Sequence, residues 1–300
     1  MIRRTLRPVL HALLLTAVSR GAMAQDLPRP ACDELAALML GRAAPAGTVC
    51  KVNLPRTDLT VSLLGASLPP AAGLTSWAAF LPAGDSSLVM GDLALSAAEL
   101  PAVMQNLVRA GFAVTAVHQH MLGEAPEMSF VHYAGQGAAR ALAQSLRSAL
   151  PPARPPAIRP ADPTIGTPGV ISGIPCARIG QEFAGGSLDS GPGFCKVTVP
   201  RNDLGITMGS LHIPASMGVA SWFAFREVPD HTAVVLTGDL ALEEDRVQAA
   251  LGAVLAGGID VVSMHNHMAG ETPRIVFFHF QARGNPLTLA ETMHAALDAR

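Results

Sequence analysis

The sequence is short of basic charge and of aromatic side chains. Only two lysines occur in 300 residues, Lys51 and Lys196, and aromatic residues make up 4% of the chain. Charged residues account for 15% and hydrophobic ones for 49%, so the chain can fill a core and is not of a disordered type. The shortage of basic residues leaves no field for phosphate backbones, and we therefore expect no nucleic-acid partner.

Long hydrophobic runs are also missing. No stretch reaches the roughly 18 apolar residues that a spanning helix needs, so we expect no transmembrane segment. Residues 1–24 instead resemble a signal peptide, with Arg3 and Arg4 at the start, an apolar stretch, and a small-x-small site ending at Ala24. Removing four arginines and no acids takes the formal charge from −2 to −6. We expect a periplasmic or secreted protein after cleavage near Ala24.

What the chain does contain is an internal duplication. The segment Cys50-Lys51-Val52 with Pro55-Arg56-Thr57-Asp58-Leu59 returns as Cys195-Lys196-Val197 with Pro200-Arg201-Asn202-Asp203-Leu204. Ser76-Trp77 and Phe80 return as Ser221-Trp222 and Phe225, and Gly91-Asp92-Leu93 returns as Gly238-Asp239-Leu240. Because these matches run in order over about 120 residues per copy, the sequence predicts two copies of one domain.

Between the copies, residues 151–168 contain seven prolines, a composition typical of an extended, semi-rigid spacer. We therefore divide the chain into a signal peptide (1–24), a first repeat (25–150), a linker (151–169) and a second repeat (170–300).

Four cysteines are present, and export would place them in an oxidising compartment. Three pairings are possible. The duplication favours one bridge per repeat, Cys32–Cys50 and Cys176–Cys195, because each copied domain would carry its own. A four-cysteine zinc site is the rival interpretation, although no C-x-x-C spacing occurs.

The order of elements predicts an α+β fold. In the first repeat we expect a strand over 87–95, a capping box at Ser96–Glu99, a helix to about Arg109 that stops at Gly111, strands over 113–121 and 128–133, and a last helix over 138–150. The second repeat follows the same order, with Asn285 capping its final helix. We expect each copy to form an open, mainly antiparallel sheet with helices on one face, resembling the β-α-β-β-α part of a ferredoxin-like unit.

The two copies agree best in one hairpin. Residues 114–133 and 261–280 share nine of twenty identities, most of them polar or special residues. Core packing alone does not predict this, since it would preserve apolar character instead. The shared set includes His118/His265, His120/His267, His132/His279, Glu124/Glu271, Gly123/Gly270 and Pro126/Pro273.

Strand geometry predicts that these histidines converge. Residues i and i+2 of a strand point to the same face, so His118 and His120 should lie side by side. If the chain turns at Gly123–Pro126, His132 should lie nearly opposite His118, with Glu124 beside them on the turn. Imidazoles and a carboxylate are the ligands of zinc and of other divalent transition metals. Hydrogen-bonded sheet histidines, or a metal-free acid–base pocket, are the alternatives.

Other repeated residues favour structural roles. Arg56 with Asp58, and Arg201 with Asp203, suggest ion pairs or turns. Asp92 and Asp239 favour capping or turn roles, with contact to the histidine face as the alternative. Trp77 and Trp222 favour the core over cofactor stacking.

Taken together, the P-R-x-D-L, S-W-x-x-F, G-D-L and H-x-H-x-x-G-E-x-P segments with the later histidine resemble the LppY/LpqO family of exported bacterial proteins. The resemblance covers most of residues 30–150 and 172–298, and it implies the repeated domain and export rather than a defined activity. Some members of that family are lipoproteins, whereas no cysteine for lipid attachment stands at the expected cleavage point here.

Two functions follow as hypotheses. The first is a periplasmic metal-binding protein, and possibly a metal-dependent hydrolase. Its metal ligands would be His118, His120, His132, His265, His267 and His279, and Glu124 and Glu271 would be further ligands or catalytic bases. The second is a non-enzymatic protein that encloses a small molecule in a metal-free histidine pocket. In a third arrangement, the two repeats pack so that both clusters line one cleft.

Overall fold

The computed structural model describes residues 29–152 and 173–299. The predicted signal peptide and nearly all of the predicted linker lie outside these residues. In the described part of the chain, no helix is long and apolar enough to cross a bilayer.

The first half contains a six-stranded, fully antiparallel sheet with strand order β1-β2-β5-β6-β8-β7. A small two-stranded sheet, β3-β4, accompanies it. The elements are α1 (Arg29–Met39), β1 (Arg42–Ala46), β2 (Val49–Pro55), β3 (Val61–Leu63), β4 (Ala66–Leu68), β5 (Thr75–Ala83), β6 (Ser86–Ser96), α2 (Leu100–Arg109), β7 (Ala113–His118), β8 (Met128–Gly137) and α3 (Ala139–Ala149).

The second half repeats this plan with strand order β15-β17-β14-β13-β10-β9, and a small sheet β12-β11-β16 lies beside it. Three short 3₁₀ helices occur as well, η1 (Asn202–Leu204), η2 (Ala215–Met217) and η3 (Glu244–Arg246). The other elements are α4 (Cys176–Glu182), β9 (Ser187–Gly191), β10 (Phe194–Pro200), β11 (Thr207–Met208), β12 (Leu211–His212), β13 (Ala220–Glu227), β14 (Val234–Glu243), α5 (Val247–Ala256), β15 (Asp260–His265), β16 (Glu271–Thr272), β17 (Ile275–Gly284) and α6 (Pro286–Asp298).

The predicted α+β class and open antiparallel sheets are confirmed. Strands β6 and β7 both pair antiparallel with β8, so they run parallel to each other with α2 as the crossover. This is the split β-α-β arrangement of a ferredoxin-like unit. Local signals set the boundaries: helix α2 gives way to Gly111, at φ +84°, and the Asn285 side chain accepts hydrogen bonds from two backbone amides at the start of α6.

The histidine hairpin differs from its prediction in two ways. Strand β7 ends at His118 instead of continuing to Met121, so His120 lies beyond the strand. A connection of nine residues, 119–127, leaves the sheet because Ala125 forms paired backbone hydrogen bonds with Ser62. The expected tight turn at Gly123–Pro126 is therefore part of a longer loop.

The register differs as well. His132 lies opposite Ala116, and His118 lies opposite Phe130, with a bulge between Val114 and Ala116. Because the offset from the predicted pairing is two residues, His118 and His132 still share one face of the sheet.

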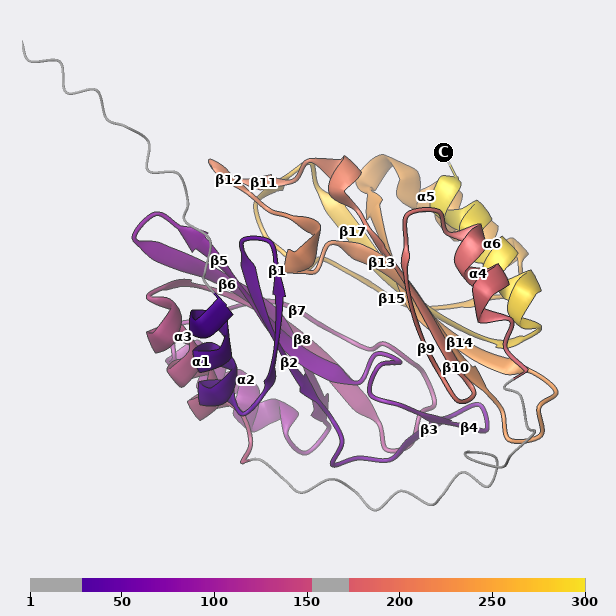
Figure 1. Ribbon diagram of the computed structural model, residues 1–300, viewed down its shortest axis with the longest axis horizontal. Helices are drawn as coiled ribbons and strands as arrows, with labels where there is room; N and C mark the ends of the chain where they lie inside the picture. Colours follow the sequence, from indigo (N-terminus) through magenta and orange to yellow (C-terminus); the bar gives the residue numbers. More distant parts are fainter. Residues whose placement is uncertain (1–28, 153–172, 300) are drawn as a thin grey trace, which may run out of the picture.

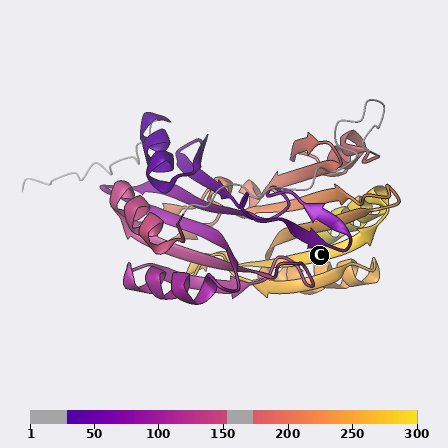
Figure 2. The ribbon, with the colours of Figure 1, turned by 90° about the horizontal axis from the view of Figure 1, so that it is seen from below.

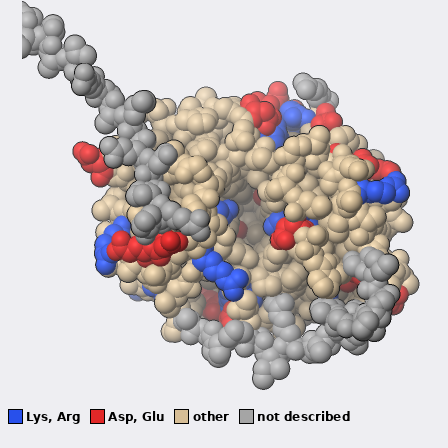
Figure 3. Space-filling view, viewed as in Figure 1, with Lys and Arg blue, Asp and Glu red and all other residues tan. Residues whose placement is uncertain are grey.

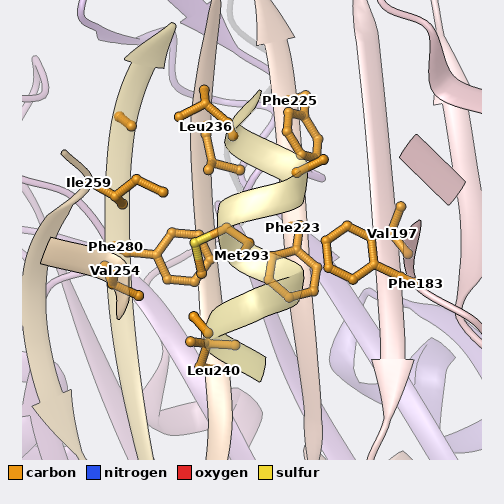
Figure 4. Packing of buried hydrophobic residues seen from close by; sticks show 14 of the residues in the cluster. Phe183, Val197, Phe223, Phe225, Leu236, Leu240, Val254, Ile259, Phe280 and Met293 are labelled. Carbon is orange, nitrogen blue, oxygen red and sulfur yellow. The ribbon is translucent and has the colours of Figure 1, made fainter. Parts of the chain in front are cut away.

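Helices cover only the outer face of each sheet. In the first half, Leu35 of α1, Leu107 of α2 and Leu146 of α3 pack on Phe80 and Leu93. The second half has the matching core, in which Phe183 stacks on Phe223 with ring centroids 4.2 Å apart and Met293 of α6 lies nearby (Figure 4). Figures 1 and 2 show the two helical layers on opposite sides of the molecule, with both sheets between them.

The helix-free faces of the two sheets pack against each other. One hydrophobic cluster joins Leu81 and Met90 of the first half to Phe277 of the second, and another joins Phe130 to Val235. The two halves therefore share cores on their inner faces while each keeps a separate core under its helices.

The cysteines follow the predicted pairing only in part. Cys32 of α1 is disulfide-bonded to Cys50 of β2, as predicted. Cys176 and Cys195 are free thiols, which differs from the prediction. The thiol of Cys176 on α4 donates to the carbonyl oxygen of Phe194, the residue before Cys195 on β10, at 3.8 Å, and burial raises the pKa of Cys195.

Candidate metal centre between the two sheets

All six repeated histidines are buried, and they form one cluster instead of one per repeat. Their exposed fractions lie between 1% and 9%. The inner faces of the two sheets bring the cluster together. Strands β7 and β8 and the loop after β7 contribute from one side, and β15, β17 and the loop after β15 contribute from the other. The third arrangement anticipated from the sequence, with both sets lining one cleft, is therefore the one observed.

The rings pair across the two halves. His118 and His265 stack at the centre with centroids 3.7 Å apart. On one side of them His120 lies 4.0 Å from His279, and on the other His132 lies 3.9 Å from His267. Each outer pair thus joins the second histidine of one H-x-H segment to the later histidine of the other repeat.

Backbone carbonyl groups fix the tautomer of the four outer histidines. Each Nδ1 lies at hydrogen-bonding distance from a carbonyl oxygen, which can only accept, so Nδ1 carries the hydrogen. Each Nε2 then presents a lone pair, the arrangement that holds metal-binding histidines in place. The pairs are His120 with Gly73 at 2.9 Å, His132 with Gly91 at 3.1 Å, His267 with Gly218 at 2.9 Å, and His279 with Gly238 at 2.9 Å.

Two of these glycines allow the halves to approach closely. Gly73 and Gly218 have φ values of +96° and +94°, which disfavour any other residue. A Cβ atom on Gly218 would also lie 2.5 Å from Trp77, and one on Gly73 would lie 3.0 Å from Trp222. Each glycine therefore leaves room for a tryptophan of the opposite repeat to pack against it, while its carbonyl group orients a histidine.

Two buried aspartates complete the cluster. Asp92 and Asp239 are 3% and 2% exposed. The Oδ2 atom of Asp92 lies 3.3 Å from Nε2 of His120, and that of Asp239 lies 3.5 Å from Nε2 of His267. Since these Nε2 atoms carry lone pairs, two hydrogen-bond acceptors face each other. Such a contact is favourable only with a cation or an additional proton between the atoms.

Every buried side-chain nitrogen or oxygen that lacks a hydrogen-bond partner, among the residues described, belongs to this cluster. Native proteins satisfy most such groups, so this concentration of unpaired atoms marks the cluster as a place that could bind a metal ion. The atoms are both ring nitrogens of His118 and of His265, Nε2 of His132 and of His279, and Oδ1 of Asp92 and of Asp239.

Three groups of side chains could hold a metal ion, each with ligand atoms within 4.8 Å of one another. Bound tetrahedral zinc brings its ligand nitrogens to about 3.5 Å, so the rings would have to close by small rotations. The groups are His118–His120–His279, His118–His132–His265 and Asp239–His265–His267.

Burial favours neutral imidazoles, the form that binds metals. It is the main cause that lowers the pKa values of His118, His132, His265, His267 and His279.

The two carboxyl groups behave differently from each other. Burial raises the pKa of Asp239 well above its usual value, and the charge of Asp92 adds to this rise. Burial alone would also raise the pKa of Asp92, but His132 and His120 hold it below its usual value. The two equivalent carboxyl groups therefore have pKa values shifted in opposite directions.

Glu124 and Glu271, expected as ligands or bases, take part in their own loops. Oε1 of Glu124 accepts the amide of Met128 at 3.0 Å, and Oε1 of Glu271 accepts that of Ile275 at 3.4 Å. Within the described residues, none of the three candidate groups includes either glutamate. The carboxylates beside the histidines are instead the aspartates of the repeated G-D-L segments.

A cleft of about 1160 Å³ opens beside the cluster, and equivalent residues of both repeats line it. Figure 3 shows this face hollowed between the two halves. His120, His132, His267 and His279 reach the cleft, as do Asp92 and Asp239. The cleft also contains Lys51 and Lys196, whose Nζ atoms lie 4.2 and 4.3 Å from the ring centroids of Trp77 and Trp222.

The tryptophans are thus half-buried cleft residues that also pack across the two halves. The remaining repeated pairs are structural, as favoured from the sequence. Arg56 binds Asp58 and Glu99 and donates to the carbonyl oxygen of Ala94, while Arg201 pairs with Asp203.

The chain belongs to the family described as Domain of Unknown Function (DUF1259), which matches residues 34–151 and again residues 179–299. Among solved structures, EtuB from Clostridium kluyveri is 9% identical, with a TM-score of 0.20 over 86% of this chain and 89% of EtuB. The trimeric bacterial microcompartment shell protein PduB is 10% identical, with a TM-score of 0.20 over 86% of this chain and 88% of PduB. A search of curated protein sequences gave no significant match.

Proposed function

We propose that this protein is exported and binds a divalent transition metal, such as zinc, in the histidine–aspartate cluster between its two sheets. The observation that carries this proposal is the contact of Nε2 of His120 with Oδ2 of Asp92, repeated between His267 and Asp239. In both contacts a lone pair faces a carboxyl oxygen, and a metal ion satisfies both atoms at once.

The alternative that the histidines are purely structural residues of the sheet agrees less well with the observed contacts. Structural histidines satisfy both ring nitrogens, whereas His118 and His265 satisfy neither in the described structure. The nitrogen and oxygen donors fit zinc, and they also fit iron, manganese or copper.

The cleft supports a catalytic form of this proposal. A metal held beside an open cleft supplies Lewis-acid chemistry to a small molecule that enters it, as in metal-dependent hydrolysis. Asp92 and Asp239, which reach both the cluster and the cleft, are the carboxyl groups placed to accept or donate a proton there. Export is supported by the signal-like residues 1–24 and by the resemblance to LppY/LpqO proteins.

Metal analysis of the whole protein tests the proposal. The untagged chain is exported from its host, purified without chelators and analysed by inductively coupled plasma mass spectrometry. We expect at least one metal ion per chain. His118→Ala should lower the metal content because His118 belongs to two of the three candidate groups. His212→Ala is the matched control, since His212 is an exposed histidine of β12. Protein that is metal-free as isolated, and that binds none of zinc, iron, manganese and copper when titrated, would refute metal binding.

The second candidate function is a non-enzymatic protein that binds a small molecule in a metal-free pocket. The volume and two-sided lining of the cleft favour it, because clefts of this size enclose small organic ligands. Metal analysis also separates the two functions, since only the first predicts retained metal.

A further inference from the structure

The only two lysines of the chain occupy the same position in the two repeats and enter the same cleft. Lys51 lies on β2 and Lys196 on β10, and both side chains are half-buried. Each ammonium group lies over the tryptophan of its own repeat, and the Nζ atom of Lys196 also donates to the carbonyl oxygen of Ala71 in the other half at 2.9 Å.

These two positive charges line one cleft. Burial lowers the pKa of Lys51 to about 8, partly offset by Asp92. Burial also lowers the pKa of Lys196 to about 8, and the charge of Lys51 adds to this shift while Asp189 opposes it. Within the described residues, neither ammonium group forms an ion pair with a carboxylate. Two desolvated like charges in one cleft are favourable when an anion lies between them.

We propose that this cleft binds a small organic anion whose carboxylate or phosphate group lies between Lys51 and Lys196. Trp77 and Trp222, which line the cleft, then provide apolar walls for the remainder of the ligand, and the cleft volume of about 1160 Å³ accommodates more than a single inorganic ion. The site does not require the metal, because the lysines carry the charge that attracts the ligand. It therefore goes beyond the proposed metal function.

Isothermal titration calorimetry on the full mature chain tests this site. The protein is stripped of metal, passed into chelator-free buffer without phosphate or carboxylate ions, and titrated with orthophosphate and separately with succinate. We expect saturable binding of at least one of the two probes. Binding of phosphate alone would assign a phosphate ligand, binding of succinate alone a carboxylate ligand, and binding of both the shared anion site. Binding of neither probe would overturn the proposal.

Charge-removing variants locate the binding. Lys51→Gln and Lys196→Gln should each weaken binding of the active probe about tenfold or more, because each removes a charge-assisted contact. Arg109→Gln is the matched control, since it removes one positive charge from an exposed position on α2 outside the cleft. Equal weakening by all three variants would indicate general electrostatics and refute the site.

Lysine labelling provides a measurement on the unchanged chain. A neutral acetylating reagent is applied near pH 8, and the acetylation of each lysine is followed by mass spectrometry, with the α-amino group as the internal reference. The bound probe should slow acetylation of both lysines together and leave the reference rate unchanged. Protection of one lysine alone would contradict a shared anion. Repeating the labelling on zinc-loaded protein separates this site from the metal proposal, since protection without zinc supports the anion site even if no metal binds.

Discussion

The contact between Asp92 and His120 is unfavourable in the metal-free protein because both contacting atoms are hydrogen-bond acceptors. The Nδ1 atom of His120 is committed to the carbonyl group of Gly73, and its Nε2 atom therefore meets a carboxyl oxygen that in its charged form also accepts hydrogen bonds. A side chain of the same shape that donates a hydrogen bond would relieve this contact and at the same time lose an anionic ligand. The two consequences have opposite signs, which makes the substitution informative.

Asp92→Asn should therefore stabilise the metal-free protein and weaken metal binding. The new amide donates to Nε2 of His120, whereas metal affinity should fall about 10- to 100-fold. Urea unfolding of the chelated protein and zinc titration measure the two effects, with exposed Asp33→Asn as the control. If Asp92 merely accepts from a protonated histidine, the variant would instead lose about 1–3 kcal/mol of stability.

The two lysines predict a dependence of stability on pH. Their pKa in the folded protein is about 8, against 10.5 ordinarily, so between these pH values the unfolded chain binds protons that the folded chain lacks. The free energy of unfolding should therefore rise with pH across this window. We expect the doubly substituted Lys51→Met, Lys196→Met protein to show a smaller rise in urea unfolding between pH 8 and 10. Identical pH slopes in the two proteins would show that these lysine pKa values are not lowered.

At the scale of the elements, β10 and α4 hold the second pair of cysteines. Cys195 is buried, and the thiol of Cys176 donates to the carbonyl oxygen of the preceding residue, Phe194. The equivalent elements of the first half, β2 and α1, carry the closed bridge. The cysteines therefore occupy equivalent positions in the two halves, although only the first pair forms a disulfide bond.

Oxidation should close the Cys176–Cys195 bond without moving either element. Non-reducing peptide mapping of protein exported to an oxidising compartment should recover this pair. Because the bond closes a loop of about 20 residues, Cys176→Ser should lower the stability of the oxidised protein by about 3 kcal/mol. The same substitution should have little effect on fully reduced protein. Recovery of free Cys176 from exported protein would contradict the expectation.

Local sequence signals predicted several helices and strands, but they did not predict where strand β7 ends and the loop after it begins. The cap at Asn285 was predicted because capping residues act within a few positions. Helix α2 was predicted as well, but its N-cap is Glu99 without a side-chain cap hydrogen bond, and only the backbone amide of Ser96 donates to the Glu99 side chain, so the expected capping box is half formed. The end of β7 could not be predicted, because the pairing of Ala125 with Ser62 joins segments 63 residues apart. The period of two residues still placed His118 and His132 on one face, since the register error was even.

The sequence predicted which histidines form the site, but it did not predict which histidines pair with each other across the two repeats. The repeated H-x-H segments identified the histidines, whereas the exchange between repeats depends on how two sheets face each other. Asp92 and Asp239 were underestimated because they were expected in turns before a helix, whereas they lie inside strands β6 and β14, paired with His132 and His279. Lys51 and Lys196 left a usable signal, since the only two lysines occupy equivalent positions.

At the scale of the whole molecule, the two halves share buried surfaces. Two hydrophobic clusters and the histidine cluster all draw on both repeats. Neither half can expose its inner face without uncovering large apolar side chains such as Phe130 and Phe277. The free energy that stabilises one half therefore depends on the presence of the other.

The halves should consequently unfold in one cooperative transition. Each half carries one tryptophan, so Trp77→Phe and Trp222→Phe leave a single reporter in the second and the first half respectively. Urea unfolding followed by fluorescence should coincide with circular dichroism within each of the two variants. Zinc should shift both reporters to higher urea by the same amount. Separate midpoints for the two signals would show that the halves unfold independently.

The exchange of histidines between repeats has a consequence for ancestry. Each outer pair takes one ring from each repeat, so a chain with a single repeat could assemble this centre only by associating with a second copy of itself. That association would be isologous, with the centre on the two-fold axis and every ligand present twice. Fusion of the two copies into one chain removes the requirement for symmetry. Positions such as Asn53 and Thr198, which line the cleft at equivalent places, are then free to differ, and an originally symmetric site can recognise a ligand that has two unlike ends.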